Sequence, residues 1–327
     1  MTDALPRPHA AKSDPRDAEL ITGRDLVVML GIAVLTPIAW LVPESRWHPL
    51  TETFARVVGA IGVGGGLRRR LDAYFAGRAP RPVAAMAAGT LGYYVDSTLQ
   101  VLRGHRPGAA WNPKIDLSGA EHVRAALDRG NGAILWISFF HYYSLISKIA
   151  THRAGFEVSH LSHPRHGFSS SRFGVRVLNR LFTVIEDRHL RERVRLSIES
   201  PLAAMRALTR RLEANGVVSI TAREAASQPA VVPFLAGVMP VATGAPDLAY
   251  RTGAALLPVH TVLGENGRFS VVIEPSIVPA ERSGDRRAFS EAAARTYAAR
   301  LETWVRRYPE QWRGWFHLGW DGTTERD

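Results

Sequence analysis

The stretch Ala133-Ile-Leu-Trp-Ile-Ser-Phe139 is apolar at every position but one, and it follows the glycine-rich triplet Gly130-Asn-Gly132. Such a triplet is typical of a helix end, and residues 121–128 before it have the pattern of a helix. A short apolar run without alternation predicts a strand that is buried on both faces of an α/β sheet. His141 follows this strand, at the sheet edge where the loops of such folds converge on a ligand.

The same alternation of helix and strand recurs towards the C-terminus. Helices are expected over residues 202–214, 248–252 and 286–307, and strands over residues 217–221, 255–262 and 269–274. The last two strands are joined by a glycine-bounded turn at residues 264–267, which predicts a hairpin. We therefore expect a single α/β domain over residues 115–320, with a central mixed sheet flanked by helices.

A hydrophobic segment lies near the N-terminus, behind a flexible polar tail of residues 1–24. Residues 26–42 are uncharged and almost wholly apolar, and as a helix they would extend roughly 26 Å, close to the ~30 Å hydrocarbon layer of a bilayer. Trp40 and Trp47 lie where an interfacial aromatic belt is expected. We interpret residues 25–43 as a hydrophobic anchor helix or a re-entrant segment, with a buried core helix as the alternative. Residues 44–114 are expected to be mainly helical, and residues 321–327 to form a second tail.

Composition excludes several kinds of site. The 327 residues are 46% hydrophobic and 22% charged, as in an ordinary globular protein. Because the chain has no cysteine, disulfides, thiolate nucleophiles and cysteine-based zinc sites are ruled out. The formal net charge of +11 favours polyanions such as anionic lipid headgroups, phosphorylated carriers or nucleic acid. No nucleic-acid partner is expected, because there is no interleaved basic and aromatic motif and such binding leaves the apolar segment unexplained.

His141 is the leading candidate for chemistry. A neutral imidazole can remove a proton from a hydroxyl as that oxygen attacks a thioester, and can return a proton to the leaving thiolate. The alternative is that His141 only packs and hydrogen-bonds among its neighbours Phe139, Phe140, Tyr142 and Tyr143.

Further motifs follow one another between residues 117 and 320. They are Gly119-Ala-Glu-His122, Val232-Pro-Phe234, Thr243-Gly244, Thr252-Gly-Ala254 and Tyr308-Pro-Glu-Gln-Trp312. In their order and spacing they resemble the lipid A biosynthesis and phosphatidylinositol mannoside acyltransferases, a branch of the lysophospholipid acyltransferase superfamily.

The resemblance implies a membrane-associated acyltransferase with a (glyco)lipid acceptor that carries a reactive hydroxyl or amine. The donor would be acyl-coenzyme A (acyl-CoA) or acyl carrier protein, used as a co-substrate, and no cofactor would be needed. Many members carry an N-terminal anchor, and the implied location is the cytoplasmic face of the inner membrane. The main alternative is a diverged relative that binds a lipid or carrier, or that performs a different transfer reaction.

One residue of the family pattern is replaced. Relatives have an acidic residue five positions after the histidine, whereas this chain has Ile146 there. A carboxylate beside the histidine fixes its tautomer and stabilises the imidazolium. Some relatives are thought to take this acid from a loop after the second core strand, where this chain has Arg223-Glu224. We therefore expect Glu224 to be the partner of His141; the alternative is a surface glutamate paired with Arg223.

Three arginines are expected to contact substrate phosphates. Relatives have a basic residue in the loop after the histidine helix, and here this loop contains Arg165 and Arg172; Arg223 is the third candidate. Arginine suits phosphate because it can donate two parallel hydrogen bonds. The alternative for the two loop arginines is a solvated surface position.

Two further groups of residues are given no catalytic role. The histidines at positions 160, 163 and 166 are regularly spaced, but Pro164 and Gly167 would interrupt a helical face, so we expect no metal site. The C-terminal aromatic residues are interpreted as core packing, with an apolar wall near a membrane as the alternative. They are Trp312, Trp315, Phe316 and Trp320, and His317 is expected to be hydrogen-bonded among them.

Overall fold

The computed structural model describes residues 19–60, 64–108, 111–162, 167, 169, 171–196, 201–222, 229–279 and 284–318. The strands in these residues are β1 (Ile115–Ser118), β2 (Ala133–Ile137), β3 (Val158–Ser162), β4 (Glu192–Arg195), β5 (Val217–Thr221), β6 (Ala230–Phe234), β7 (Gly237–Val241), β8 (Ala255–Leu263) and β9 (Phe269–Ile273). The helices are α1 (Gly23–Leu41), α2 (Trp47–Ala60), α3 (Gly65–Phe75), α4 (Val83–Arg103), α5 (Ala120–Asp128), α6 (Ile146–Arg153), α7 (Arg172–Arg176), α8 (Arg180–Asp187), α9 (Pro201–Glu213), α10 (Gly244–Thr252) and α11 (Arg286–Arg307). Short 3-10 turns are η1 (Glu44–Arg46), η2 (Pro309–Gln311) and η3 (Arg313–Phe316).

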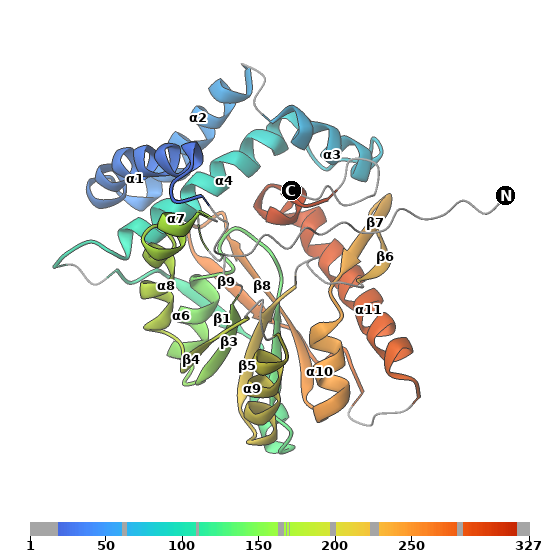
Figure 1. The fold of residues 1–327 in the computed structure, drawn as a ribbon. Helices are drawn as coiled ribbons and strands as arrows, with labels where there is room; N and C mark the ends of the chain where they lie inside the picture. Colours follow the sequence, from blue (N-terminus) through green and yellow to red (C-terminus); the bar gives the residue numbers. More distant parts are fainter. Residues whose placement is uncertain are drawn as a thin grey trace.

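Seven of the described strands form one sheet in the order β1-β9-β8-β2-β5-β3-β4 (Figure 1). β8, β2, β5, β3 and β4 run parallel to one another. β9 pairs antiparallel with β8, and β1 pairs parallel with β9. β6 and β7 form a separate antiparallel hairpin. The predicted α/β fold with a central mixed sheet flanked by helices is therefore confirmed.

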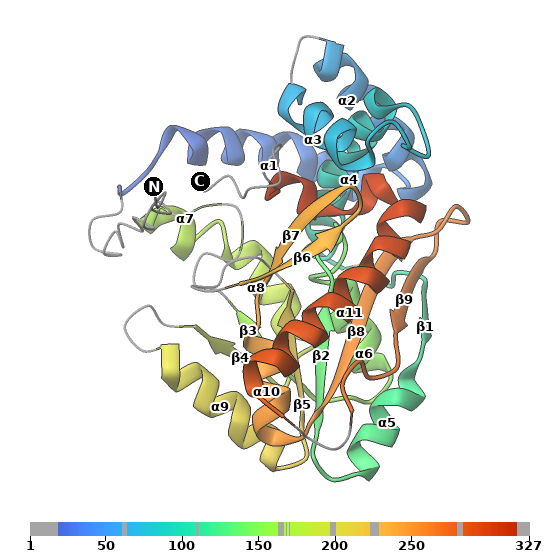
Figure 2. The ribbon, with the colours of Figure 1, turned by 90° about the vertical axis from the view of Figure 1, so that its right-hand side faces the viewer.

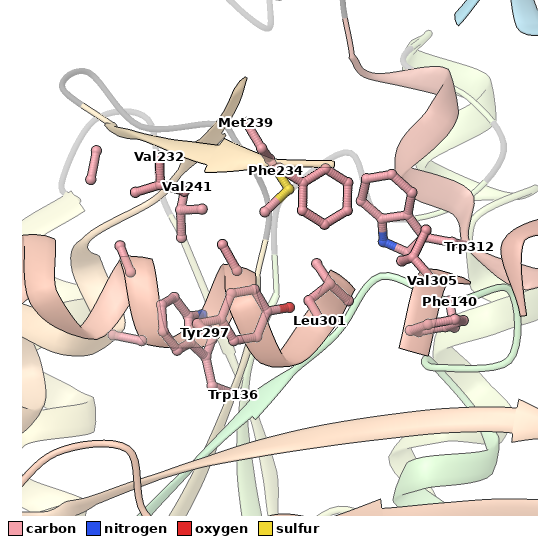
Figure 3. Packing of buried hydrophobic residues seen from close by; sticks show 14 of the residues in the cluster. Trp136, Phe140, Val232, Phe234, Met239, Val241, Tyr297, Leu301, Val305 and Trp312 are labelled. Carbon is pink, nitrogen blue, oxygen red and sulfur yellow. The ribbon is translucent and has the colours of Figure 1, made fainter. Parts of the chain in front are cut away.

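β2 lies inside the sheet, and its side chains alternate between two apolar layers. Ile134 and Trp136 belong to the layer that α9, α10 and α11 cover, whereas Leu135 and Ile137 belong to the layer formed with α5 and α6. In the first layer Trp136 packs on Tyr297 of α11, with ring centroids 4.3 Å apart (Figure 3). Because helices cover both faces of the sheet (Figure 2), every residue of β2 can be apolar.

Most predicted elements are present close to their predicted bounds. α11 covers the predicted residues 286–307, β5 covers the predicted residues 217–221, and β8 and β9 form the predicted hairpin. β2 ends two residues earlier than predicted, because the chain leaves the sheet and Phe140 pairs antiparallel with Trp312 instead. A tertiary contact of this kind is not visible in a local pattern.

The helices α1 to α4 lie together at one end of the molecule (Figures 1 and 2). α4 is the most buried of them, and its inner face includes Met86, Leu99 and Leu102. The alternative of a buried core helix does not hold for α1, since only Asp25 and Ala39 among its residues are buried. Among the described residues, α1 is the helix that is long and apolar enough to cross a membrane, by length and composition alone.

Gly119 fixes the start of α5 against the sheet. Its φ is +80°, and a Cβ at this position would lie 1.8 Å from the carbonyl oxygen of Ile273, at the end of β9. Gly77 has a similar φ of +75°, but a Cβ there would meet nothing within 4 Å. An alanine at Gly77 would therefore add backbone strain alone, whereas an alanine at Gly119 would add both backbone strain and steric overlap.

We expect Gly119→Ala to lower the free energy of unfolding by at least about 3 kcal/mol, because the backbone of β9 must move to make room. Gly77→Ala should cost only about 1–2 kcal/mol, the strain of a left-handed alanine. Thermal unfolding of the two variants in one detergent measures the difference. Equal losses would contradict the close approach at Gly119.

Candidate active site

The loop after β2 carries His141 at the edge of the sheet where β2, β5 and β8 end. β2 pairs in register with both neighbours, so the three strand ends are aligned. The backbone N–H of Ser138 still donates to the carbonyl of Val259 at 2.8 Å, after which the chain turns away from the sheet. His141 therefore lies beyond a central parallel strand, as its place in the sequence predicts.

The C-terminal motif holds this loop in place. The amide of His141 donates to the carbonyl of Gln311 at 2.9 Å, and the amide of Arg313 donates to the carbonyl of Phe139 at 2.9 Å. At the end of β8, the side chain of Gln311 accepts a hydrogen bond from the amide of Leu263 at 2.7 Å and donates to its carbonyl at 2.8 Å. Residues 139–141 are thus fixed by a segment far away in the sequence.

The other residues of the motif also have identifiable contacts. Glu310 is 7% exposed and forms an ion pair with Arg81. Trp315 donates its indole N–H to the carbonyl of Pro309 at 2.7 Å. Trp312 packs on Phe234 of the β6–β7 hairpin, with ring centroids 5.1 Å apart (Figure 3). The prediction that these tryptophans form core packing is confirmed.

The imidazole of His141 is buried within the protein. It is 3% exposed, and within the described part of the chain neither ring nitrogen has a hydrogen-bond partner. The rings of Tyr93, Tyr94 and Phe316 surround it, with centroids 6.5, 6.1 and 6.3 Å away. Since buried polar atoms in proteins nearly always have a partner, these two nitrogens are available to a ligand.

His141 lines a cavity of about 200 Å³, together with Arg24 of α1 and Arg313. The guanidinium of Arg313 lies over the rings of Tyr94 and Phe139, 4.9 and 5.4 Å from their centroids. Burial, and then the positive charge of Arg313, lower the pKa of His141 well below its ordinary value. The surroundings of the ring therefore favour the neutral imidazole.

Carboxylates near the loop are engaged elsewhere. Asp96 of α4 accepts a hydrogen bond from the hydroxyl of Tyr142 at 2.9 Å, and burial raises the pKa of Asp96 to about 6. Glu186 is 1% exposed and forms an ion pair with the buried Lys148 at 2.8 Å. Ile146, at the position of the family's acid, is 1% exposed and forms part of the cavity wall. The described residues therefore offer the catalytic candidate no carboxylate partner.

A buried polar chain lies beneath the loop. The hydroxyl of Ser138 accepts a hydrogen bond from Tyr297 at 2.9 Å and lies 2.9 Å from Nδ1 of His260, whose Nε2 is 3.4 Å from Glu274. This order is similar to a serine–histidine–acid triad. However, Ser138 and His260 are both 0% exposed, and neither lines the cavity. The chain therefore holds the end of β2 rather than presenting a nucleophile.

Among the other predicted site residues the structure describes Arg172, and it does not place Arg172 at the cavity. Arg172 begins α7, is exposed and does not line the cavity, although Gly167 of the same loop does. Residues Arg165, Arg223, Glu224 and Trp320 lie outside the described residues.

Four residues around His141 were not predicted. Arg313 directly follows the C-terminal motif, so its place in the sequence was a usable signal. Tyr93 and Tyr94 lie on α4, and Arg24 lies in the first turn of α1. No motif marks these three positions, and only the fold brings them to the cavity.

The chain is similar to known proteins at the level of a family. No curated protein matches it significantly. The family model of the bacterial lipid A biosynthesis acyltransferases matches residues 15–321. That range includes the N-terminal helices, the sheet, His141 and the motif that holds its loop. Since the match covers nearly the whole chain, this protein belongs to the bacterial lipid A biosynthesis acyltransferase family and is an acyltransferase.

Proposed function

We propose that the protein moves a fatty acyl group from acyl-CoA or acyl carrier protein to a hydroxyl or amine of a glycolipid, with His141 as the general base. The observation that carries this proposal is the buried imidazole, whose ring nitrogens have no hydrogen-bond partner among the described residues and which lines a cavity. A ligand hydroxyl in that cavity would supply the missing hydrogen bond.

In the reaction, one proton moves from the acceptor to His141 and then from His141 to the leaving group. One ring nitrogen of the neutral imidazole takes the proton of the acceptor hydroxyl while its oxygen attacks the thioester carbon. The carbon–sulfur bond then breaks, and the imidazolium gives the proton to the leaving thiolate. The products are a free thiol and an ester, or an amide when the acceptor is an amine, so atoms and electrons balance without a further reactant.

Arg313 would act on the negative charge of the reaction. A guanidinium beside the imidazole attracts the oxyanion that forms when the thioester carbon becomes tetrahedral. The described residues give Arg313 ring contacts rather than an ion pair, so its charge is not neutralised by a neighbouring carboxylate. The two effects act together, because this charge also keeps the base unprotonated.

Four residues complete the proposal. Glu224 would orient His141, and this is supported by β5, which ends at Thr221 on the same sheet edge as β2. Arg165, Arg172 and Arg223 would contact substrate phosphates, and for Arg165 this is supported by Gly167, a cavity residue two positions later in the sequence.

The family is typically membrane-associated, and we propose the cytoplasmic face of the inner membrane as the location. Acyl-CoA and acyl carrier protein are cytoplasmic donors, and the net charge of +11 favours a surface rich in anionic lipid. The exposed apolar side of α1 supports contact with lipid.

A second candidate is a diverged relative that binds a lipid or carrier, or that transfers a different group. Ile146 favours it, because the wall of the cavity is apolar where relatives have an acid. Activity measurements separate the two candidates.

We expect His141→Ala to lower thiol release from palmitoyl-CoA by about 10²–10⁴-fold, because the acceptor hydroxyl loses its base. Glu224→Gln should lower it by at least roughly tenfold. The assay uses purified protein in detergent, with and without a total lipid extract as acceptor. His122→Ala, which changes a histidine on α5 outside the cavity, should leave the rate unchanged.

Each result decides one step. Equal release from all variants would end the mechanism based on His141. Loss in His141→Ala alone would exclude Glu224 as the partner. No release from palmitoyl-CoA or from palmitoyl acyl carrier protein, with lipid still bound, would favour the diverged relative.

A second prediction concerns the dependence of kcat/KM on pH. The base works only when neutral, so activity falls as the pH drops through the pKa of His141. Because that pKa is lowered, wild-type activity should persist below pH ~6.5, the usual value for histidine. Arg313→Gln removes a like charge, so it should raise the pKa of His141 and move the acid limb to higher pH.

Arg306→Gln is the matched control, because Arg306 pairs with Glu302 on the outside of α11. This variant should keep the wild-type acid limb. An acid limb that stays in place in Arg313→Gln would show that His141 is not the group that titrates.

A further inference from the structure

The exposed side of α1 is a single apolar stripe. Its members are Leu26, Val27, Leu30, Val34 and Leu41, which are between 57% and 79% exposed. At 3.6 residues per turn, these positions fall within an arc of about 100° on the helix surface. A stripe of this width is typical of a helix that buries one side only.

The N-terminal end of α1 is fixed to the body of the protein. Asp25, 0% exposed, accepts a hydrogen bond from the hydroxyl of Ser169. Just before the helix, the carbonyls of Glu19 and Leu20 accept hydrogen bonds from the first two amides of α7, at 3.1 and 3.0 Å. This end therefore lies against the loop and helix that follow β3.

The C-terminal end of α1 is fixed to α4. The indole N–H of Trp40 donates to the carbonyl of Leu102 at 2.9 Å, and Arg103 donates to the carbonyl of Val42. The inner side of α1 packs with Leu99 and Leu102 of α4. α4 also carries the polar residues Asp96 and Arg103, so it cannot follow α1 into hydrocarbon.

We propose that α1 does not cross the membrane but lies in its plane, with the apolar stripe inserted into one leaflet of an anionic phospholipid bilayer. A spanning helix of 19 residues would place its ends on opposite sides of the hydrocarbon layer. Here both ends bind the same folded body, so both stay on one side. Arg24 and Arg46 are exposed at the two ends of the helix, and their charges match anionic headgroups.

This orientation has a consequence for the active site. Arg24 belongs to the first turn of α1 and also lines the cavity of His141. With α1 in the membrane plane, the cavity opens at the level of the headgroups, and a lipid can reach His141 without leaving its leaflet. The inference rests on the membrane association in the proposed function, and it adds the orientation of α1 relative to the membrane.

The absence of cysteine makes a direct test simple, because each introduced thiol is the only one in the chain. Leu20→Cys and Ser45→Cys report the two ends of α1, and Leu202→Cys, on the exposed surface of α9, reports the folded body. The full-length variants are expressed in a Gram-negative host and treated with a membrane-impermeant maleimide, in intact spheroplasts and after the membrane is opened.

We expect all three positions to react only after the membrane is opened. Opposite behaviour of Leu20→Cys and Ser45→Cys would overturn the proposal, because it shows a spanning helix. Reaction of all three in intact spheroplasts would keep the in-plane helix but move the enzyme to the other face. Absence of the protein from the membrane fraction would overturn the inference, while thiol release in detergent would still test the acyl transfer separately.

Binding to vesicles tests the stripe itself. Leu30→Asp should weaken binding to phosphatidylethanolamine–phosphatidylglycerol vesicles by roughly tenfold, since it places a charge in the apolar layer. Leu202→Asp is the matched control, because it changes an exposed leucine on α9, a helix that lies away from α1 (Figures 1 and 2). Equal vesicle binding by both variants would show that the stripe does not contact lipid. If Leu30→Asp instead prevented self-association of the protein without weakening vesicle binding, the stripe would be a contact between two copies of the chain.

Discussion

The antiparallel pairing of residues 139–141 with residues 311–313 is the constraint on which the rest of the site depends. β2 alone would bring His141 only to the edge of the sheet. The two backbone hydrogen bonds from this pairing set the height and direction of the loop, and so place the ring among Tyr93, Tyr94 and Phe316. The same short motif also contacts the end of β8 and the segment before α4, so the sheet, the N-terminal helices and the C-terminus meet at one point.

The surroundings of His141 favour its neutral form. Burial and the nearby Arg313 both oppose a positive charge on the ring, and the described residues supply no carboxylate to offset them. Each unit by which a pKa falls corresponds to about 1.4 kcal/mol against the imidazolium. The cavity therefore favours the neutral imidazole that the proposed mechanism requires, and it makes the protonated state costly. In the proposed mechanism, Glu224 or negative charge on the substrate would stabilise that state.

The fold was largely predictable, whereas the site was predictable only in part. β2, β5 and α11 follow from apolar runs, glycine signals and charge placement, all of which act within a few neighbouring residues. His141 could be identified because it follows a strand, and Arg313 because it adjoins a motif. Tyr93, Tyr94 and Arg24 could not, because their role depends on how α1 and α4 pack across the end of the sheet. For Ile146, the sequence shows that an apolar residue replaces an acid. Its position in the cavity wall could not be predicted, because it also depends on the packing of the fold.

The order of the elements along the chain also determines when, during synthesis, the loop of His141 can be held in place. β9, the last strand of the large sheet, ends at Ile273, whereas the loop of His141 is held by residues that come after α11. During synthesis the sheet can therefore assemble before the loop of His141 is held in place. A chain that stopped after α11 would keep all seven strands and lose the hydrogen bonds that position His141. The arrangement around His141 is thus a property of chains that include residues 311–313, because those residues hold its loop.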